Sequence, residues 1–213
     1  MDRRTETLET WNKVALLYQE KFMDLTLYNK TYDAICDAIV IENAVILEVG
    51  CGPGNIARYL LSKRKDWNIM GIDIAPAMIA LAKENVPQAR FEVFDTRNIH
   101  ELNTNFDGIV CGFCMPYLSE EDCLRLISNS YNLLKEEGIL YLSFIEGDPL
   151  NSGYQVGSSG DKLFVYFHRL HDIKLMLFEH KFENLTIFPI EYVKSDGEME
   201  IHTIVIASKS KSL

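Results

Sequence analysis

Basic charge is scarce in this sequence. Its 213 residues include 21 lysines and arginines against 31 aspartates and glutamates, which gives a formal net charge of −10. The densest basic cluster is the short segment SKRK at 62–65. Because proteins that bind nucleic acid rely on basic patches that displace counterions from phosphates, we expect no nucleic-acid partner. A small molecule is the expected partner.

Long apolar runs are also lacking. No segment approaches the roughly 18 consecutive apolar residues that a membrane span needs, and the start, MDRRTETLET, has no apolar stretch of the signal-peptide kind. We therefore expect no membrane association and a cytoplasmic location. The composition, 47% hydrophobic and 24% charged, fits one globular domain with a full core.

The cysteine pattern gives no support to a disulfide framework or a metal site. Five cysteines are an odd number, and only Cys111 and Cys114 have CxxC spacing. A structural zinc site needs a second pair of ligands, and the sequence has no other CxxC and no HxxxH, so we expect no metal. A redox dithiol is the alternative, but the pair does not open a helix near the start of a βαβ unit, so two ordinary semi-buried thiols are favoured.

Strand-like and helix-like blocks alternate along the chain. Apolar residues at three- and four-residue spacing predict helices, and short apolar runs predict strands. The expected helices cover about 7–23, 28–41, 55–65, a stretch opened by Pro76, 119–135 and 168–182, and the expected strands cover 44–50, 68–73, 90–95, 106–112, 138–146, 185–193 and 198–208. This alternation predicts a doubly wound α/β fold, with a mostly parallel sheet and helices on both faces. Asp196-Gly197 predicts that the sheet ends in an antiparallel hairpin.

These elements divide a single domain into four parts. We expect an N-terminal helical cap at 1–43, a cofactor-binding core at 44–146, a lid loop at 147–167, and a C-terminal helix and hairpin at 168–213. The loop is rich in glycine and serine and follows the carboxyl end of the fifth strand, the edge where open α/β sheets bind ligands. A mobile surface loop is the alternative to a lid.

The segment LEVGCGPGN at 47–55 follows an apolar strand and places glycines at positions 50, 52 and 54. Glycines between a strand and a helix let a ligand approach the main chain closely. A dinucleotide site needs the spacing GxGxxG, but Asn55 stands where the third glycine belongs. No Gly-Lys-Ser/Thr follows either, so the pattern argues against both a nicotinamide site and a phosphate loop.

LEVGCGPGNIARYL resembles the first motif of the class I S-adenosylmethionine-dependent methyltransferases, which have a seven-stranded Rossmann-like fold. Further motifs follow in order over roughly residues 11–146: Asp73 resembles the acid that binds the ribose hydroxyls, Asp95-Thr96 the pair at the adenine edge, and FDGIVCGF the strand at the methionine end. The resemblance implies S-adenosylmethionine as the cofactor and a small-molecule acceptor. The residues expected to bind the cofactor are Tyr18, Glu48, Gly50, Cys51, Gly52, Gly54, Asn55, Asp73, Ile74, Met78, Asp95, Thr96, Cys111, Gly112 and Phe113.

Two positions depart from the family's patterns. Ala75 stands where the family often has serine or threonine. The segment CGFCMPY after the fourth strand lacks the acid or amide that begins the Asn/Asp-Pro-Pro-Tyr motif of DNA amino-group methylases, which argues against base methylation.

The acidic residues also have chemical reasons of their own. A carboxylate about 20 residues past the glycines can accept hydrogen bonds from both hydroxyls of a ribose. Glu48 lies inside an apolar strand, where a carboxylate is costly unless it is paired, and a cationic ligand would supply the partner. The alternatives are an ion pair with Arg58 for Glu48, and helix capping or a solvated strand end for Asp73 and Asp95.

The expected reaction is methyl transfer by in-line displacement, in which the protein mainly aligns the reactants and excludes water. The N-terminal helix with Trp11, Ala15 and Tyr18 is expected to cover the cofactor, with plain helix packing as the alternative. Tyr28, Tyr117 and Tyr154 are candidates to line the acceptor pocket by stacking, with ordinary packing as the alternative. His168 is the candidate general base, with His171 beside it, although a helix-surface histidine without a catalytic role is the alternative. Two other functions stay open, a non-catalytic S-adenosylmethionine binder and a nicotinamide-dependent oxidoreductase, and so does a homodimer.

Overall fold

The computed structural model describes residues 3–156, 160–194 and 196–211. Residues 157–159, inside the predicted lid, and Ser195, beside the predicted turn, lie outside the described residues, as do the two residues at each terminus.

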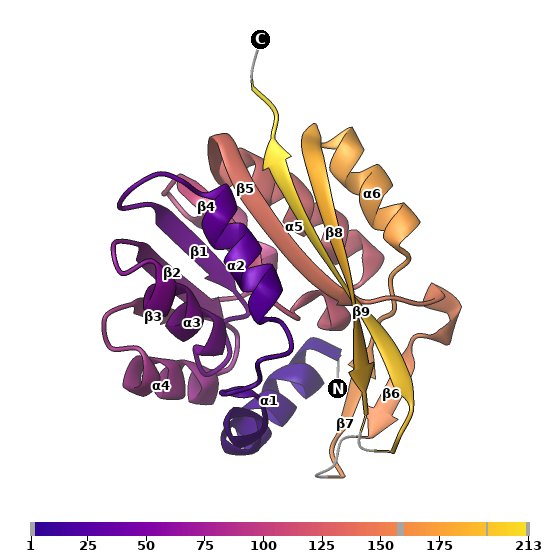
Figure 1. Ribbon diagram of the computed structural model, residues 1–213. Coiled ribbons are helices and arrows are strands. Elements are labelled where there is room, and N and C mark those ends of the chain that lie inside the picture. Colours follow the sequence, from indigo (N-terminus) through magenta and orange to yellow (C-terminus); the bar gives the residue numbers. More distant parts are fainter. Residues whose placement is uncertain (1–2, 157–159, 195, 212–213) are drawn as a thin grey trace.

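A seven-stranded sheet forms the centre of the molecule, with the strand order β3-β2-β1-β4-β5-β9-β8 (Figure 1). Six strands run parallel and β9 runs antiparallel between β5 and β8. The strands are β1 (Val45–Val49), β2 (Asn68–Asp73), β3 (Arg90–Val93), β4 (Phe106–Cys111), β5 (Leu134–Ile145), β8 (Phe182–Val193) and β9 (Met199–Lys209). The order reverses between β1 and β4, and ligands of open α/β sheets bind at such a reversal, outside the carboxyl ends of the strands.

Helices cover both faces of the sheet. They are α1 (Arg3–Phe22), α2 (Asn29–Ala38), α3 (Asn55–Lys63), α4 (Pro76–Asn85), α5 (Glu120–Leu133) and α6 (Leu170–Glu179). Apolar residues of α2, α3 and α4 pack in one buried cluster, and those of α5 and α6 pack in another on the opposite face. All six residues of β4 are buried, as a strand covered on both faces requires.

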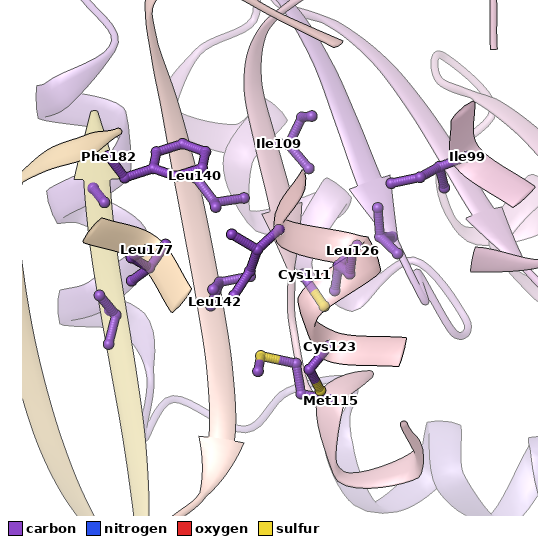
Figure 2. Close-up of a cluster of buried hydrophobic side chains, with 14 of the residues drawn as sticks. Ile99, Ile109, Cys111, Met115, Cys123, Leu126, Leu140, Leu142, Leu177 and Phe182 are labelled. Atoms are coloured by element: carbon purple, nitrogen blue, oxygen red, sulfur yellow. The ribbon is translucent and has the colours of Figure 1, made fainter. Parts of the chain in front are cut away.

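Figure 2 shows part of the cluster on the α5 and α6 face. Leu140 and Leu142 of β5 belong to this cluster together with Leu177 of α6, and Cys123 of α5 lies beside Met115. These side chains are almost fully buried, so this face of the sheet holds the site's strands in a fixed arrangement.

Local sequence signals explain where the helices begin. The Ser119 hydroxyl accepts a hydrogen bond from the Asp122 backbone N–H at 3.2 Å, and acidic residues fill the first turn of α5. Pro76 is the first residue of α4. The doubly wound fold with its terminal antiparallel hairpin is confirmed.

The segment 147–167, predicted to be a lid loop, contains regular secondary structure that the sequence analysis did not predict. It contains a short 3₁₀ helix (Pro149–Asn151) and a separate two-stranded antiparallel sheet formed by β6 (Gly153–Val156) and β7 (Lys162–Val165). Tyr154, Val156 and Phe164 give these short strands enough β-forming residues to pair, although glycine and serine dominate the composition around them. The hairpin lies near α1 in the lower part of Figure 1.

Candidate active site

A cavity of about 250 Å³ opens at the carboxyl ends of β1, β2 and β4. We call it the central pocket. Eleven of the predicted cofactor residues line it: Tyr18, Gly50, Gly52, Asn55, Asp73, Ile74, Met78, Asp95, Thr96, Gly112 and Phe113. Glu48, Cys51, Gly54 and Cys111 are outside its lining, so any role they have in binding is indirect in this arrangement.

The loop that follows β1, residues 50–54, exposes its main chain to the pocket, and we call it the glycine loop. Gly50, Gly52 and Gly54 have φ angles of 67°, 52° and 85°, in the left-handed region that favours glycine. A Cβ on Gly50 would lie 2.9 Å from Cys114 Cβ, so this position excludes a side chain on steric grounds as well. The loop is therefore built for close approach of a ligand to the backbone.

Asp73 joins the glycine loop to the start of α4. Its Oδ2 accepts a hydrogen bond from the Gly52 N–H at 2.9 Å, and its Oδ1 accepts one from the Ala75 N–H at 2.8 Å. Burial raises the pKa of Asp73, and these N–H groups oppose the shift. Each carboxylate oxygen can accept a second hydrogen bond, so Asp73 can cap the turn and still bind two ligand hydroxyls.

Asp95 lies at another corner of the pocket and is held by two arginines. Arg4 Nη2 of α1 is 2.7 Å from Asp95 Oδ2, and Arg97 Nη1 is 3.5 Å from Asp95 Oδ1. Asp95 Oδ1 also accepts a hydrogen bond from the Arg97 backbone N–H at 3.0 Å, which is the capping role considered as the alternative. Thr96 completes this corner, with its Oγ1 3.6 Å from Cys114 Sγ.

Glu48 is a fully buried carboxyl group, and no residue that the structure describes forms an ion pair with it. Neither of its oxygens forms a hydrogen bond of normal geometry. Burial raises its pKa to about 8, although the Ala57 backbone N–H acts in the opposite direction. The alternative pairing with Arg58 is wrong, because Arg58 Nη2 binds Asp24 Oδ1 at 2.5 Å. Because Glu48 is outside the pocket lining and burial favours its uncharged form, the structure gives no direct support to its predicted pairing with a cationic ligand.

The helix α1 covers the pocket with aromatic side chains. Trp11 contacts Tyr18 edge to face, with ring centroids 5.4 Å apart, and it contacts Tyr117 in the same way at 5.2 Å. Ala15, which lies between Trp11 and Tyr18 in the sequence, is buried and packs near Ala75 and Met78. Trp11 and Tyr18 line the pocket, and cover of a bound cofactor by this helix stays a prediction.

The β6–β7 hairpin holds α1 from its outer side. The Arg3 guanidinium stacks 3.8 Å from the centroid of the Phe164 ring, Lys13 Nζ lies 2.6 Å from Asp161 Oδ1, and the Tyr154 hydroxyl donates to Glu6 Oε2 at 2.7 Å. The segment predicted to be a lid thus contacts α1, and α1 in turn lines the pocket.

His168 lies away from the central pocket. Its ring is buried, with Nε2 3.0 Å from the Met115 carbonyl oxygen and 3.7 Å from Cys123 Sγ. Burial lowers the pKa of His168, while the Met115 carbonyl opposes the shift. It is therefore not the surface histidine considered as the alternative. Its catalytic role stays a prediction, and this geometry does not favour it.

Sequence reasoning missed a histidine that does line the pocket. His202 of β9 is 6% exposed, and its Nδ1 is 2.7 Å from the Tyr28 hydroxyl oxygen. The sequence analysis selected His168, with His171 beside it, and neither of these two lines the pocket. The missed signal was the spacing of Glu200 and His202, because residues two apart in a strand face the same side.

The cysteines are all free thiols. Cys111 is buried in β4, and Cys114 lies in the pocket wall against Gly50. A hydrogen bond with Cys111 lowers the pKa of Cys114, burial opposes it, and Thr96 adds to the lowering. Within residues 3–156, 160–194 and 196–211, histidines, cysteines and acids form no group suited to a metal ion.

Comparison with known proteins agrees with this site. Residues 46–138 match the family described as "Methyltransferase domain". A putative methyltransferase of Invertebrate iridescent virus 6 is 30% identical over 138 residues, which cover 64% of this chain and 49% of the viral protein. A trans-aconitate 2-methyltransferase of Variovorax paradoxus is 43% identical over 99 residues, which cover 46% of this chain and 38% of that enzyme. The chain thus spans half or less of the length of these two relatives.

Solved structures share the fold over nearly the whole chain. Magnesium protoporphyrin IX methyltransferase from Synechocystis PCC 6803, with bound S-adenosylhomocysteine, superposes with a TM-score of 0.75 at 18% identity, covering 98% of this chain and 100% of that one. A methyltransferase from Methanosarcina mazei gives a TM-score of 0.69 at 22% identity and covers 84% of this chain and 98% of that one. At these identities the likeness concerns the fold.

The chain has the Rossmann-like fold of these methyltransferases, and residues 46–138 match a methyltransferase domain. Asp73 can still accept hydrogen bonds from two hydroxyls, which suits the ribose of a nucleoside ligand. None of the described helices combines the length and the apolar character that a bilayer span demands.

Proposed function

We propose that this protein transfers a methyl group from S-adenosylmethionine to a small-molecule acceptor. The observation that carries the proposal is that the glycine loop, Asp73 and Asp95 line the same cavity as a set of aromatic side chains from α1, β8 and β9. One part of the cavity suits a nucleoside, and the rest leaves room for an acceptor.

The protein's residues have distinct roles in this proposal. The Asp73 carboxylate receives the ribose hydroxyls, and Asp95 with Thr96 binds the adenine edge. The bare backbone of the glycine loop and the turn at Gly112 and Phe113 holds the methionine end. The sulfonium activates the methyl group, so the protein mainly aligns the acceptor and excludes water. Cover of the pocket by α1 and the β6–β7 hairpin supports that exclusion, and we propose that they act together as the lid.

The test is formation of S-adenosylhomocysteine with a panel of small acceptors, together with calorimetry of donor binding. Turnover of at least one acceptor is expected. Tight donor binding without turnover of any acceptor would favour the alternative of a non-catalytic binder. Stabilisation by NADH rather than by S-adenosylmethionine in a thermal-shift assay would favour an oxidoreductase, which Asn55 argues against.

The setting of the activity is part of the proposal. Five free cysteines are typical of a reducing compartment, so we place the protein in the cytoplasm. The acidic net charge of −10 argues against nucleic acid as a partner. A homodimer stays a prediction, and the molecular mass in solution would test it.

A further inference from the structure

Three residues form a hydrogen-bonded line in the wall of the central pocket. The Tyr28 hydroxyl oxygen is 2.7 Å from His202 Nδ1, and His202 Nε2 is 3.4 Å from Glu200 Oε2. All three residues line the pocket, and Tyr28 and His202 are each 6% exposed. We call this line the Tyr-His-Glu relay.

The partners of His202 decide where its proton lies. An ionised carboxylate only accepts hydrogen bonds, and the bond from His202 lowers the pKa of Glu200, with Lys194 adding to the effect against burial. The neutral imidazole therefore carries its proton on Nε2, facing Glu200. Its Nδ1 then accepts from the Tyr28 hydroxyl. The Tyr28 oxygen keeps free lone pairs and can accept a proton from a ligand as it passes its own to Nδ1.

Packing fixes the relay in place. The Tyr192 ring stacks on the His202 ring, with centroids 4.7 Å apart and planes 14° apart. Phe113 contacts both Tyr28 and His202, at centroid distances of 4.8 Å and 5.0 Å. Phe113 follows β4, and its N–H donates to Ser143 Oγ at 2.6 Å. The relay therefore packs against the turn after β4, where we propose that the methionine part of the donor binds.

The charges around the relay indicate the class of acceptor. Among the described residues that line the pocket, the lysines and arginines are Arg4 and Arg97, and both are paired with Asp95 at another corner. The relay end carries Glu200 instead. The nearby Lys194 is outside the pocket lining and is paired with Glu200, with Nζ 3.4 Å from Oε1, so a carboxylate acceptor would meet no basic side chain among the described lining residues at this end. The aromatic walls suit a flat, neutral ring instead.

We propose that the Tyr-His-Glu relay removes the proton of a phenolic hydroxyl as that oxygen is methylated, an inference that rests on the proposed function. The bond from the acceptor oxygen to the methyl carbon forms while the bond from sulfur to that carbon breaks, and the sulfur leaves with the electron pair. The phenolic proton passes to the Tyr28 oxygen, and the Tyr28 proton passes to His202 Nδ1. Glu200 holds the resulting imidazolium, as the acid of a catalytic triad does.

The first test compares acceptors of similar size: phenol, aniline and benzoate, each with S-adenosylmethionine. Turnover of phenol ahead of the other two supports the assignment. Turnover of aniline or benzoate alone, or of none of the three while the donor binds, overturns it. Failure of the donor to bind at all would instead overturn the proposed function, so the two failures are distinguishable.

The second test uses variants and the acidity of the acceptor. Tyr28→Phe and His202→Gln should slow methylation of phenol by about 10²-fold, the usual contribution of a general base. Both should methylate 4-nitrophenolate, which is already ionised, at close to the wild-type rate. Equal losses on both acceptors would mean a structural role and would overturn the relay. Tyr59→Phe also loses one hydroxyl hydrogen bond, to Asp33 outside the pocket, and serves as the matched control.

A third measurement needs no turnover. The ¹⁵N signals of the His202 ring, assigned with the His202→Gln variant, should show that the neutral form of the ring carries its proton on Nε2 in the protein without ligand. Tyr28→Phe should shift the Nδ1 signal, because that atom loses its donor. A ring protonated on Nδ1, or an Nδ1 signal unchanged in Tyr28→Phe, would overturn the relay even if the variants fold poorly.

Discussion

Replacing Glu48 by glutamine should change how the stability of the unliganded protein depends on pH. Burial raises the pKa of Glu48 from 4.5 to about 8, so the folded protein holds this proton more tightly than the unfolded chain does. The stabilisation is fully present below the unfolded pKa, and it is lost as pH rises through the folded pKa. This is the reverse of the usual behaviour of an acidic residue.

The size of the effect follows from the two pKa values. Each pKa unit corresponds to about 1.4 kcal/mol. The shift of the Glu48 pKa therefore lowers the free energy of unfolding by at most about 5 kcal/mol as the pH rises from the unfolded pKa to the folded pKa. Glutamine does not titrate in this range. It leaves a buried amide in the same place, and the cost of that amide is independent of pH.

The assay is urea unfolding of the wild type and of Glu48→Gln at several pH values from about 5 to 9, without donor. The variant should gain several kcal/mol in free energy of unfolding, relative to the wild type, over this range. Glu84→Gln, at an exposed position of α4, should show no such trend. A difference between Glu48→Gln and the wild type that stays constant with pH would refute the reasoning.

Three further substitutions test the pocket itself. Asp73→Ala should weaken S-adenosylmethionine binding at least about tenfold in calorimetry, because charge-assisted hydrogen bonds contribute roughly 1.5–3 kcal/mol, and unchanged affinity would contradict the ribose assignment. Gly50→Ala should lower the free energy of unfolding by more than Gly197→Ala does, since both positions have positive φ but only Gly50 would also bring a Cβ to 2.9 Å from Cys114; equal losses would show that the contact relaxes freely. Trp11→Ala should raise the Kd of the donor by removing part of the cover formed by α1, and a wild-type Kd would show that this helix does not close over the bound donor.

Sequence predicted the fold well because its signals are local. The apolar runs of β1 and β4, the glycines after β1 and the Ser119 cap each report on their own neighbourhood, and together they determine a doubly wound sheet. The β6–β7 hairpin escaped prediction because its two strands have only four residues each within a glycine-rich segment. Pairing and contact with α1, rather than local propensity, make it a sheet.

The candidate site was predictable for the donor and only in part for the acceptor, since Tyr28 and Tyr117 line the pocket as suggested but His202 was missed. Asp73 and Asp95 lie at the ends of neighbouring parallel strands, so their convergence follows from the topology. Tyr28 and His202 are 174 residues apart and meet because β9 inserts between β5 and β8 in one particular register. Nothing local in the sequence specifies that register, and so attention went to His168, which packs against Met115 instead.

The central claim is that the cavity at the carboxyl ends of β1, β2 and β4 is the binding site of the methyl donor. Isothermal titration calorimetry with S-adenosylmethionine and with S-adenosylhomocysteine tests it most directly. We predict that both bind at one site per chain and compete with each other. Absence of binding heat for both compounds, across temperatures, would contradict the account.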